Sequence, residues 1–109
     1  MDLSALQQKI AGNSAILLYF FNDHCAPCLS LRPKVQDLIE NDFSKIDLLF
    51  VNSEKYPGLT AHYSVFSNPT LIMFFEGKEF QRWSKFVSVS QIASAIEKPY
   101  SLLFDNENQ

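Results

Sequence analysis

The stretch FFNDHCAPCLSLRP, residues 20–33, contains both cysteines of the 109-residue chain, Cys25 and Cys28. It overlaps an unbroken apolar run, AILLYFF at 15–21, which predicts a strand buried on both faces of a sheet. Apolar residues at helical spacing follow and predict a helix over residues 26–41. A C-x-x-C pair between a buried strand and a helix indicates redox chemistry, because the helix N-terminus stabilises the thiolate of the first cysteine.

Two other interpretations of the cysteine pair stay open at this point: half of a structural zinc site, or two small side chains that pack in the core. Zinc takes about four ligands, and the chain has only His24 and His62 to add to the cysteines. His24 also neighbours Cys25, which is an awkward geometry for shared ligation. Free cysteines often pack as small apolar residues, but a polar loop-to-helix junction favours a reactive pair. We therefore predict no metal site.

Hydrophobic periodicity along the rest of the chain predicts alternating helices and strands. Pro33 lies inside the first long helical pattern and predicts a kink near residues 29–33. Ser88 and Gln91 have the spacing of a capping box. The other predicted elements are a helix over 2–11, a strand over 46–52, a short helix from Pro57 to Tyr63, strands over 70–75 and 79–85, and a last helix from Val89 that ends at Pro99.

The order of these elements predicts an α/β fold with helices on both faces of one mixed four-stranded sheet. Strand 15–21 is expected at the centre because it is apolar throughout, and strand 79–85 at an edge because polar residues alternate along it. The length suits one domain. We expect this domain over residues 1–99, followed by a partly disordered tail over residues 100–109.

Charge and hydropathy exclude several classes of function. The net charge of −3, without a cluster of Lys and Arg, argues against nucleic-acid binding, which requires a basic face. The opening residues, MDLSALQQKI, have neither the basic start nor the long apolar core of a secretory signal. The longest apolar run, at 15–21, is shorter than the roughly 18–20 residues that span a bilayer. We expect a soluble, cytoplasmic protein that binds neither nucleic acid nor membrane.

Two segments, AILLYFFNDHCAPCLSLRP at 15–33 and SNPTLIMFFEGKE at 67–79, resemble the thioredoxin family. The family pattern is a strand, W-C-G-P-C, a kinked helix, and a proline-threonine turn opposite the cysteines. Pro33, the Asn-Pro-Thr at 68–70 and Gly77 all fall at family spacings. The match extends over nearly the whole chain and is far more specific than the C-x-x-C alone. It implies a thioredoxin-like three-layer α/β/α fold.

The resemblance implies a thiol–disulfide oxidoreductase that exchanges or reduces protein disulfides. Cys25 would be the attacking thiolate, Cys28 the resolving thiol, and Pro69 a cis proline beside the disulfide. The implied partners are protein disulfide substrates and a reductase that regenerates the dithiol, and no cofactor is implied. The backbone at Asn68 would pair with an extended substrate chain. The positions implied to contact substrates are His24, Ala26, Pro27, Asn68, Pro69 and Phe86.

Two positions beside the cysteines depart from the family pattern. Tyr19 takes the place of the family's buried aspartate, six residues before Cys25, and Phe50 takes the place of the neighbouring lysine. Because tyrosine is neutral near pH 7, it is a poor base for the proton of Cys28. We therefore expect a more oxidising disulfide than in ordinary thioredoxins, and resolution by Cys28 that is slower or uses water.

Three positions around the site also depart from the pattern. His24 replaces the family's tryptophan, Ala26 the glycine between the cysteines, and Phe86 the glycine after the last strand. A protonated His24 would stabilise the neighbouring thiolate, whereas a solvated His24 needs no special role. Phe86 is either a core residue or an exposed one that reshapes the groove for partner proteins. Both pairs of interpretations stay open.

The start of the chain aligns with the family's first helix, so the family's N-terminal strand is expected to be missing. Strand 46–52 would then lie at an edge with its LLF open to pairing. Either YSLLF at 100–104 covers this edge or a second copy pairs with it. We expect a monomer, with an edge-strand dimer as the alternative. The altered rim also keeps a second function open: a thioredoxin-like partner-binding or adaptor module with weak redox activity.

Overall fold

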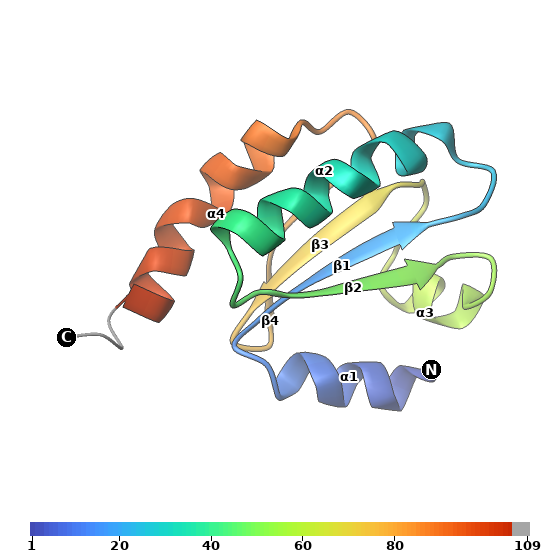
Figure 1. Ribbon diagram of the computed structural model, residues 1–109. Helices are drawn as coiled ribbons and strands as arrows, with labels where there is room; N and C mark the ends of the chain where they lie inside the picture. The colour runs from blue at the N-terminus through green and yellow to red at the C-terminus, as the bar shows by residue number, and fades with distance from the viewer. Residues whose placement is uncertain (106–109) are drawn as a thin grey trace.

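A computed structural model gives the architecture and describes residues 1–105 (Figure 1). The helices and strands follow one another in the predicted order. The elements are α1 (Leu3–Ala11), β1 (Ala15–Phe21), α2 (Ala26–Asp42), β2 (Asp47–Asn52), α3 (Pro57–His62), β3 (Thr70–Phe75), β4 (Lys78–Trp83) and α4 (Val89–Phe104).

The four strands form one mixed sheet in the order β2-β1-β3-β4. Strand β1 runs parallel to β2 and antiparallel to β3, and β4 returns antiparallel to β3. The predicted central position of β1 and edge position of β4 are confirmed. Strand β4 itself starts one residue earlier and ends two residues earlier than the predicted span 79–85. Every residue of β1 from Ala15 to Phe20 is buried, as expected for a strand covered on both faces.

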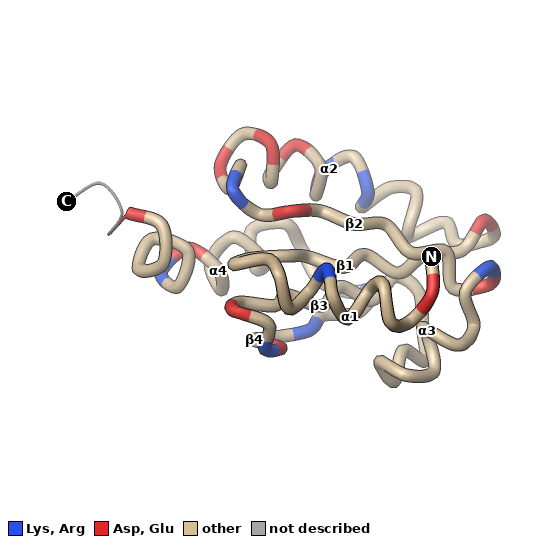
Figure 2. The backbone as a smooth tube through the Cα atoms, turned by 90° about the horizontal axis from the view of Figure 1, so that it is seen from below, with Lys and Arg blue, Asp and Glu red and all other residues tan. Residues whose placement is uncertain are grey.

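Helices cover both faces of the sheet, giving three layers (Figure 1). The core on one face joins side chains of β1 and β3 to those of α2 and α4, and the core on the other face joins the opposite strand side chains to those of α1 and α3. Figure 2 shows α1 lying across the second face, with Lys and Arg interspersed among Asp and Glu over the described chain. Lys9 of α1 forms a 3.1 Å ion pair with Asp47 of β2.

Side chains cap the N-termini of α1 and α4. The Asp2 carboxylate accepts a hydrogen bond from the Ala5 N–H at 2.8 Å and caps α1. Ser88 and Gln91 form the predicted capping box of α4, each side chain bonding the other's backbone N–H. No helix within residues 1–105 combines the length and the apolar character needed to cross a membrane.

Helix α4 is longer than predicted, because Pro99 lies inside it and does not end it. The proline removes one backbone donor, which is a real cost in a helix interior. The turn that follows offsets this cost through tertiary contacts: the Tyr100 ring packs edge-on against Phe43 at 5.1 Å, and its hydroxyl accepts a 3.1 Å bond from the Lys45 N–H. Pro33 likewise lies inside α2 without ending it.

The predicted tail over residues 100–109 starts within α4, and its part beyond residue 105 lies outside the described residues. Residues 100–104 extend α4, with Tyr100 packed against Phe43 and Phe104 packed against Tyr100. Within residues 1–105, β2 pairs with β1 alone, so its outer edge carries no other strand. The pairing of this edge with a second copy stays a prediction.

Candidate functional site

Cys25 and Cys28 lie at the N-terminus of α2, directly after the turn that follows β1. The two side chains form a disulfide, with their Cα atoms 5.2 Å apart. Cys25 is the N-cap residue, and its Sγ accepts the Cys28 N–H at 3.2 Å. The helix N-terminus therefore supplies a hydrogen bond and a positive dipole end to the Cys25 sulfur. Cys25 is 9% exposed and Cys28 only 2%, so the first sulfur is the more accessible.

The residues that flank the cysteines are exposed. His24, Ala26 and Pro27 all present their side chains to solvent, and Pro27 stands in the first turn of α2, where its missing N–H costs little. The His24 backbone N–H donates to Asn22 Oδ1 at 2.9 Å, which shapes the turn before Cys25. The other histidine, His62, contacts Gln7 at 3.4 Å. Within residues 1–105, no three His, Cys, Asp or Glu side chains gather as a metal site would require.

The Asn68–Pro69 peptide bond is cis, as the resemblance implied. Pairing of Phe20 with Thr70 places Pro69 at the same end of the sheet as the segment that leads from β1 to Cys25. Asn68 is anchored there because its Oδ1 accepts a 2.8 Å bond from Ser53 Oγ. Pro69 is buried and Asn68 half-buried. The loop before β3 is thus fixed beside the cysteine segment.

Phe86 follows β4 and is 86% exposed, so its interpretation as a core residue is wrong. Register explains where it lies: Trp83 pairs with Leu71, which places the residues after Trp83 at the same end of the sheet as Pro69. The Lys85 ammonium lies 5.0 Å from the centre of the Phe86 ring. A large apolar ring therefore stands free on the end of the sheet that carries the cysteines.

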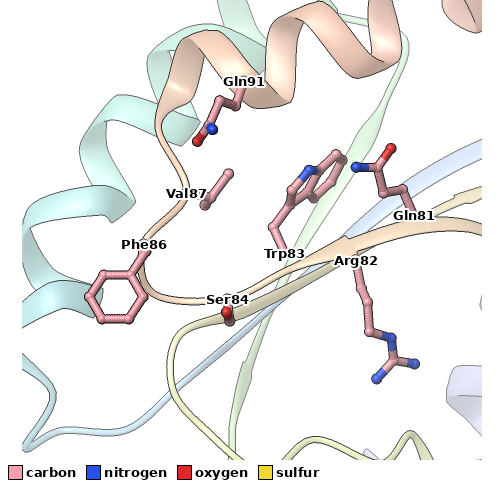
Figure 3. A pocket seen from close by; sticks show the side chains of 7 residues that line it. All are labelled: Gln81, Arg82, Trp83, Ser84, Phe86, Val87 and Gln91. Atoms are coloured by element: carbon pink, nitrogen blue, oxygen red, sulfur yellow. The ribbon is translucent and has the colours of Figure 1, made fainter.

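A pocket of about 400 Å³ borders Phe86 between β4 and the start of α4 (Figure 3). Gln81 and Trp83 project from β4 toward Gln91 of α4, whereas Arg82 projects to the opposite side of the strand (Figure 3). The alternation follows from the two-residue period of a strand. The pocket extends the surface around Phe86 along the outer strand of the sheet.

Tyr19 lies fully buried beneath the cysteines, and its hydroxyl donates a 2.8 Å hydrogen bond to the Cys28 carbonyl oxygen. Phe50 is its partner on β2: the two rings lie 5.2 Å apart, as their register pairing requires. Burial raises the pKa of Tyr19 to about 12, while the charge of Arg32 acts in the opposite direction. Tyr19 is thus neutral near pH 7 and offers no carboxylate-like base next to Cys28.

The raised pKa of Tyr19 predicts a loss of stability in alkaline solution. The folded-state pKa of about 12 exceeds the unfolded value of 10.0, so above pH 10 the unfolded state releases a proton that the folded state keeps. We expect the free energy of unfolding to fall by about 2 kcal/mol between pH 10 and pH 12 relative to Tyr19→Phe. Urea unfolding of both proteins across this range measures the difference. A difference that stays constant with pH would contradict the assignment.

Arg32 is the residue of this cluster that the sequence reasoning missed. Its guanidinium carbon lies 3.9 Å from the centre of the Phe50 ring and 5.1 Å from that of Phe21. The helical spacing from Cys28 to Arg32 was visible in the sequence, but the contact with Phe50 depends on the pairing of β1 with β2. Leu29 and Phe66 were also missed, and both are exposed, the latter to 91%.

Comparison with known sequences finds matches along most of the chain. The thioredoxin family model matches residues 2–98. A thioredoxin from Pyropia yezoensis is 31% identical over 97 residues, which cover 89% of this chain and 91% of that protein. Thioredoxin-like protein YdfQ from Bacillus subtilis (strain 168) is 25% identical over 101 residues, with 93% of this chain and 89% of that protein covered.

Solved structures of thioredoxins superpose on most of this chain. The X-ray structure of Fasciola hepatica thioredoxin superposes with a TM-score of 0.73 at 27% identity, covering 88% of this chain and 89% of that one. Mitochondrial thioredoxin 3 from Saccharomyces cerevisiae, in its oxidised form, superposes with a TM-score of 0.79 over 88% of this chain and 89% of that one. At 16% identity the yeast structure shows likeness of fold alone.

Proposed function

The chain belongs to the thioredoxin family, and from this premise we propose that it reduces or exchanges disulfide bonds of other proteins through Cys25 and Cys28. Family membership together with the close cysteine pair supports thiol–disulfide oxidoreductase chemistry. The observation that carries the proposal is the placement of Cys25 as N-cap of α2, where its sulfur accepts the Cys28 N–H. This placement favours the thiolate, which is the nucleophile in disulfide exchange.

The proposed reaction has two exchange steps. The Cys25 thiolate attacks one sulfur of a substrate disulfide, forms a mixed disulfide, and releases the other substrate sulfur as a thiolate. Cys28 then loses its proton, attacks the Cys25 sulfur, and releases the second substrate thiolate as the Cys25–Cys28 disulfide forms. Two electrons pass from the dithiol to the substrate, and a reductase or another dithiol donor restores the reduced form.

The rim of the site would receive the substrate. We assign His24, Ala26 and Pro27 to the side of the groove next to the cysteines, because all three are exposed there. We assign Asn68 and Pro69 to the opposite side, where the backbone before the cis bond would pair with an extended substrate chain. Phe86, exposed on the same end of the sheet, adds an apolar contact that a glycine could not make.

Tyr19 supports the expectation that this pair is more oxidising than an ordinary thioredoxin pair. A buried carboxylate would disfavour a nearby thiolate, whereas the Tyr19 hydroxyl carries no charge and is committed to the Cys28 carbonyl. Stabilising the Cys25 thiolate stabilises the reduced, dithiol form of the pair and therefore raises the reduction potential of the disulfide. The same absence of a base predicts that the proton of Cys28 passes to water in the second step.

The proposal is tested by reduction of insulin disulfides with dithiothreitol as the electron donor. We expect the wild-type protein to accelerate reduction well above the uncatalysed rate. Cys25→Ser is expected to fall back to that rate, because the remaining thiol of Cys28 is buried and does not reach a substrate disulfide. Lys34→Ser, exposed on the same helix, is the matched control and is expected to keep full activity. Wild-type protein at the uncatalysed rate would overturn the proposal.

A second candidate function is a partner-binding or adaptor module with weak redox activity. The exposure of Phe86 favours it, since exposed apolar side chains next to a site can contribute to the binding of a partner protein. The adaptor predicts little turnover of insulin by the wild-type protein, so the same assay separates the two functions. A cytoplasmic location and a monomeric state remain predictions of the sequence, open to cell fractionation and to light scattering.

A further inference from the structure

We propose that Arg32 is a positioning residue for the second exchange step: it holds a positive charge behind Cys28 and stabilises the thiolate of this resolving cysteine. The inference rests on the proposed function, because it concerns the step in which Cys28 attacks. It adds a residue whose type and position neither the C-x-x-C motif nor the cis-proline loop specifies.

Helical geometry places Arg32 next to Cys28. The two residues are four positions apart in α2, a spacing that brings Cβ atoms to about 5–6 Å on one helix face. The Arg32 side chain is half-buried, and its guanidinium lies over the rings of Phe50 and Phe21, at 3.9 and 5.1 Å from their centres. Two aromatic rings thus fix the position of the charge, and partial burial strengthens its field.

The field of Arg32 reaches the atoms around Cys28. Burial raises the pKa of Tyr19, and the charge of Arg32 opposes that shift, so the guanidinium acts on the Tyr19 hydroxyl. This hydroxyl lies 2.8 Å from the carbonyl oxygen of Cys28 itself. The positive charge of Arg32 therefore acts on atoms in the immediate surroundings of the resolving cysteine.

The side chains of the cluster that contains Tyr19 and Cys28, together with Arg32 over Phe50, explain why a cation is useful. Strand β1 contributes Tyr19, which is neutral near pH 7; strand β2 contributes Phe50, which has no charge; and α2 contributes Cys25 and Arg32. None of these four side chains offers a carboxylate to accept the Cys28 proton. With no such base, the fraction of Cys28 that is ionised depends on how well the thiolate is stabilised, and a nearby cation does this.

The step balances without a further reactant. In the mixed disulfide, the Cys28 thiol gives its proton to water, and the resulting thiolate attacks Cys25 Sγ. The Cys25–Cys28 bond forms, the bond from Cys25 to the substrate sulfur breaks, and the substrate leaves as a thiolate that takes a proton from water. Arg32 neither donates nor accepts a proton, and its guanidinium stays charged throughout.

The test measures the pKa of the Cys28 thiol from the ultraviolet absorbance of its thiolate, in a Cys25→Ala background where no other thiol is present. We expect Arg32→Met, which keeps a long apolar stem over Phe50 but removes the charge, to raise this pKa by about one unit. Arg32→Lys, which keeps a cation at this position, is expected to have a Cys28 pKa close to that of the parent protein with Arg32. A merely structural role for Arg32 would not distinguish lysine from methionine.

Equal Cys28 pKa values in the Arg32→Met and Arg32→Lys proteins, or no change in either from the parent, would overturn the inference. If Arg32→Met does not fold, as judged by thermal melting, Arg32→Gln provides the neutral side chain for the same comparison. Failure of the proposed function is seen separately, as wild-type protein that does not accelerate insulin reduction. A charge-dependent Cys28 pKa in an inactive protein would overturn the function, and a charge-independent pKa in an active protein would overturn the role of Arg32.

Discussion

Replacing Cys28 with serine is expected to lower the release of fully reduced substrate by about 100-fold or more, while attack by Cys25 continues. The reason is that the two cysteines at the start of α2 act in different steps: Cys25 attacks the substrate, and Cys28 releases it. Cys25 keeps its N-cap position, and its sulfur is the more accessible of the two, so the first exchange proceeds. The serine hydroxyl at position 28 cannot displace the substrate sulfur, because a hydroxyl is barely ionised at neutral pH.

The measurement is a single turnover with pre-reduced protein and no added thiol, so that no external donor can resolve the mixed disulfide. Reduced substrate is quantified against time for wild type, Cys28→Ser and the control Lys34→Ser. Release by Cys28→Ser within a few-fold of wild type would mean that resolution does not need Cys28. Thermal melting of each oxidised or alkylated protein checks that the serine at a buried position leaves the fold intact.

Truncating Tyr19 to alanine is expected to lower the free energy of unfolding by about 3–5 kcal/mol, the usual cost of removing a large buried ring. The side chain is fully buried in the centre of the sheet, packs at a tilt against Phe50, and donates a hydrogen bond to the Cys28 carbonyl oxygen. Tyr19→Phe is the matched control. It keeps the ring and loses one hydrogen bond, so its expected cost is about 1 kcal/mol.

Urea unfolding of the oxidised proteins measures both changes, followed by the fluorescence of Trp83, the single tryptophan. The comparison separates the ring from the hydroxyl: most of the loss should appear only in Tyr19→Ala. If Tyr19→Phe is as destabilised as Tyr19→Ala, the hydroxyl bond to Cys28 outweighs packing. If neither variant is destabilised by more than about 1 kcal/mol, Tyr19 does not support the site as described.

The order and type of the elements could be predicted because each strand and helix carries a clear local pattern. The apolar run of β1 and the helical stripes of α2 and α4 are examples. The end of α4 could not be predicted, since Pro99 is a strong local signal for a stop. It is overridden by Tyr100, which packs against Phe43 from a distant part of the chain. Local pattern decides most elements, and long-range packing decides this boundary.

The candidate site likewise has features that local motifs predict and features that depend on long-range packing. The cysteine pair, the loop of Asn68 and Pro69, and the replacement at Tyr19 were all visible as motif positions. The exposure of a side chain cannot be predicted in this way: an apolar residue such as Phe86 is usually buried, yet here it is exposed to solvent. The role of Arg32 depends on a contact between α2 and β2, which follows from the sheet register and not from its own sequence neighbours.

The most direct test of the oxidoreductase account is the mass of the covalent complex that Cys28→Ser forms with a disulfide-bonded protein substrate. One substrate chain is expected to be linked to Cys25. Dithiothreitol should release it, and the double variant Cys25→Ser with Cys28→Ser should form no such complex. A complex that forms equally well without Cys25, or no complex under conditions where wild type reduces the substrate, would contradict the assignment of Cys25 as the attacking thiolate.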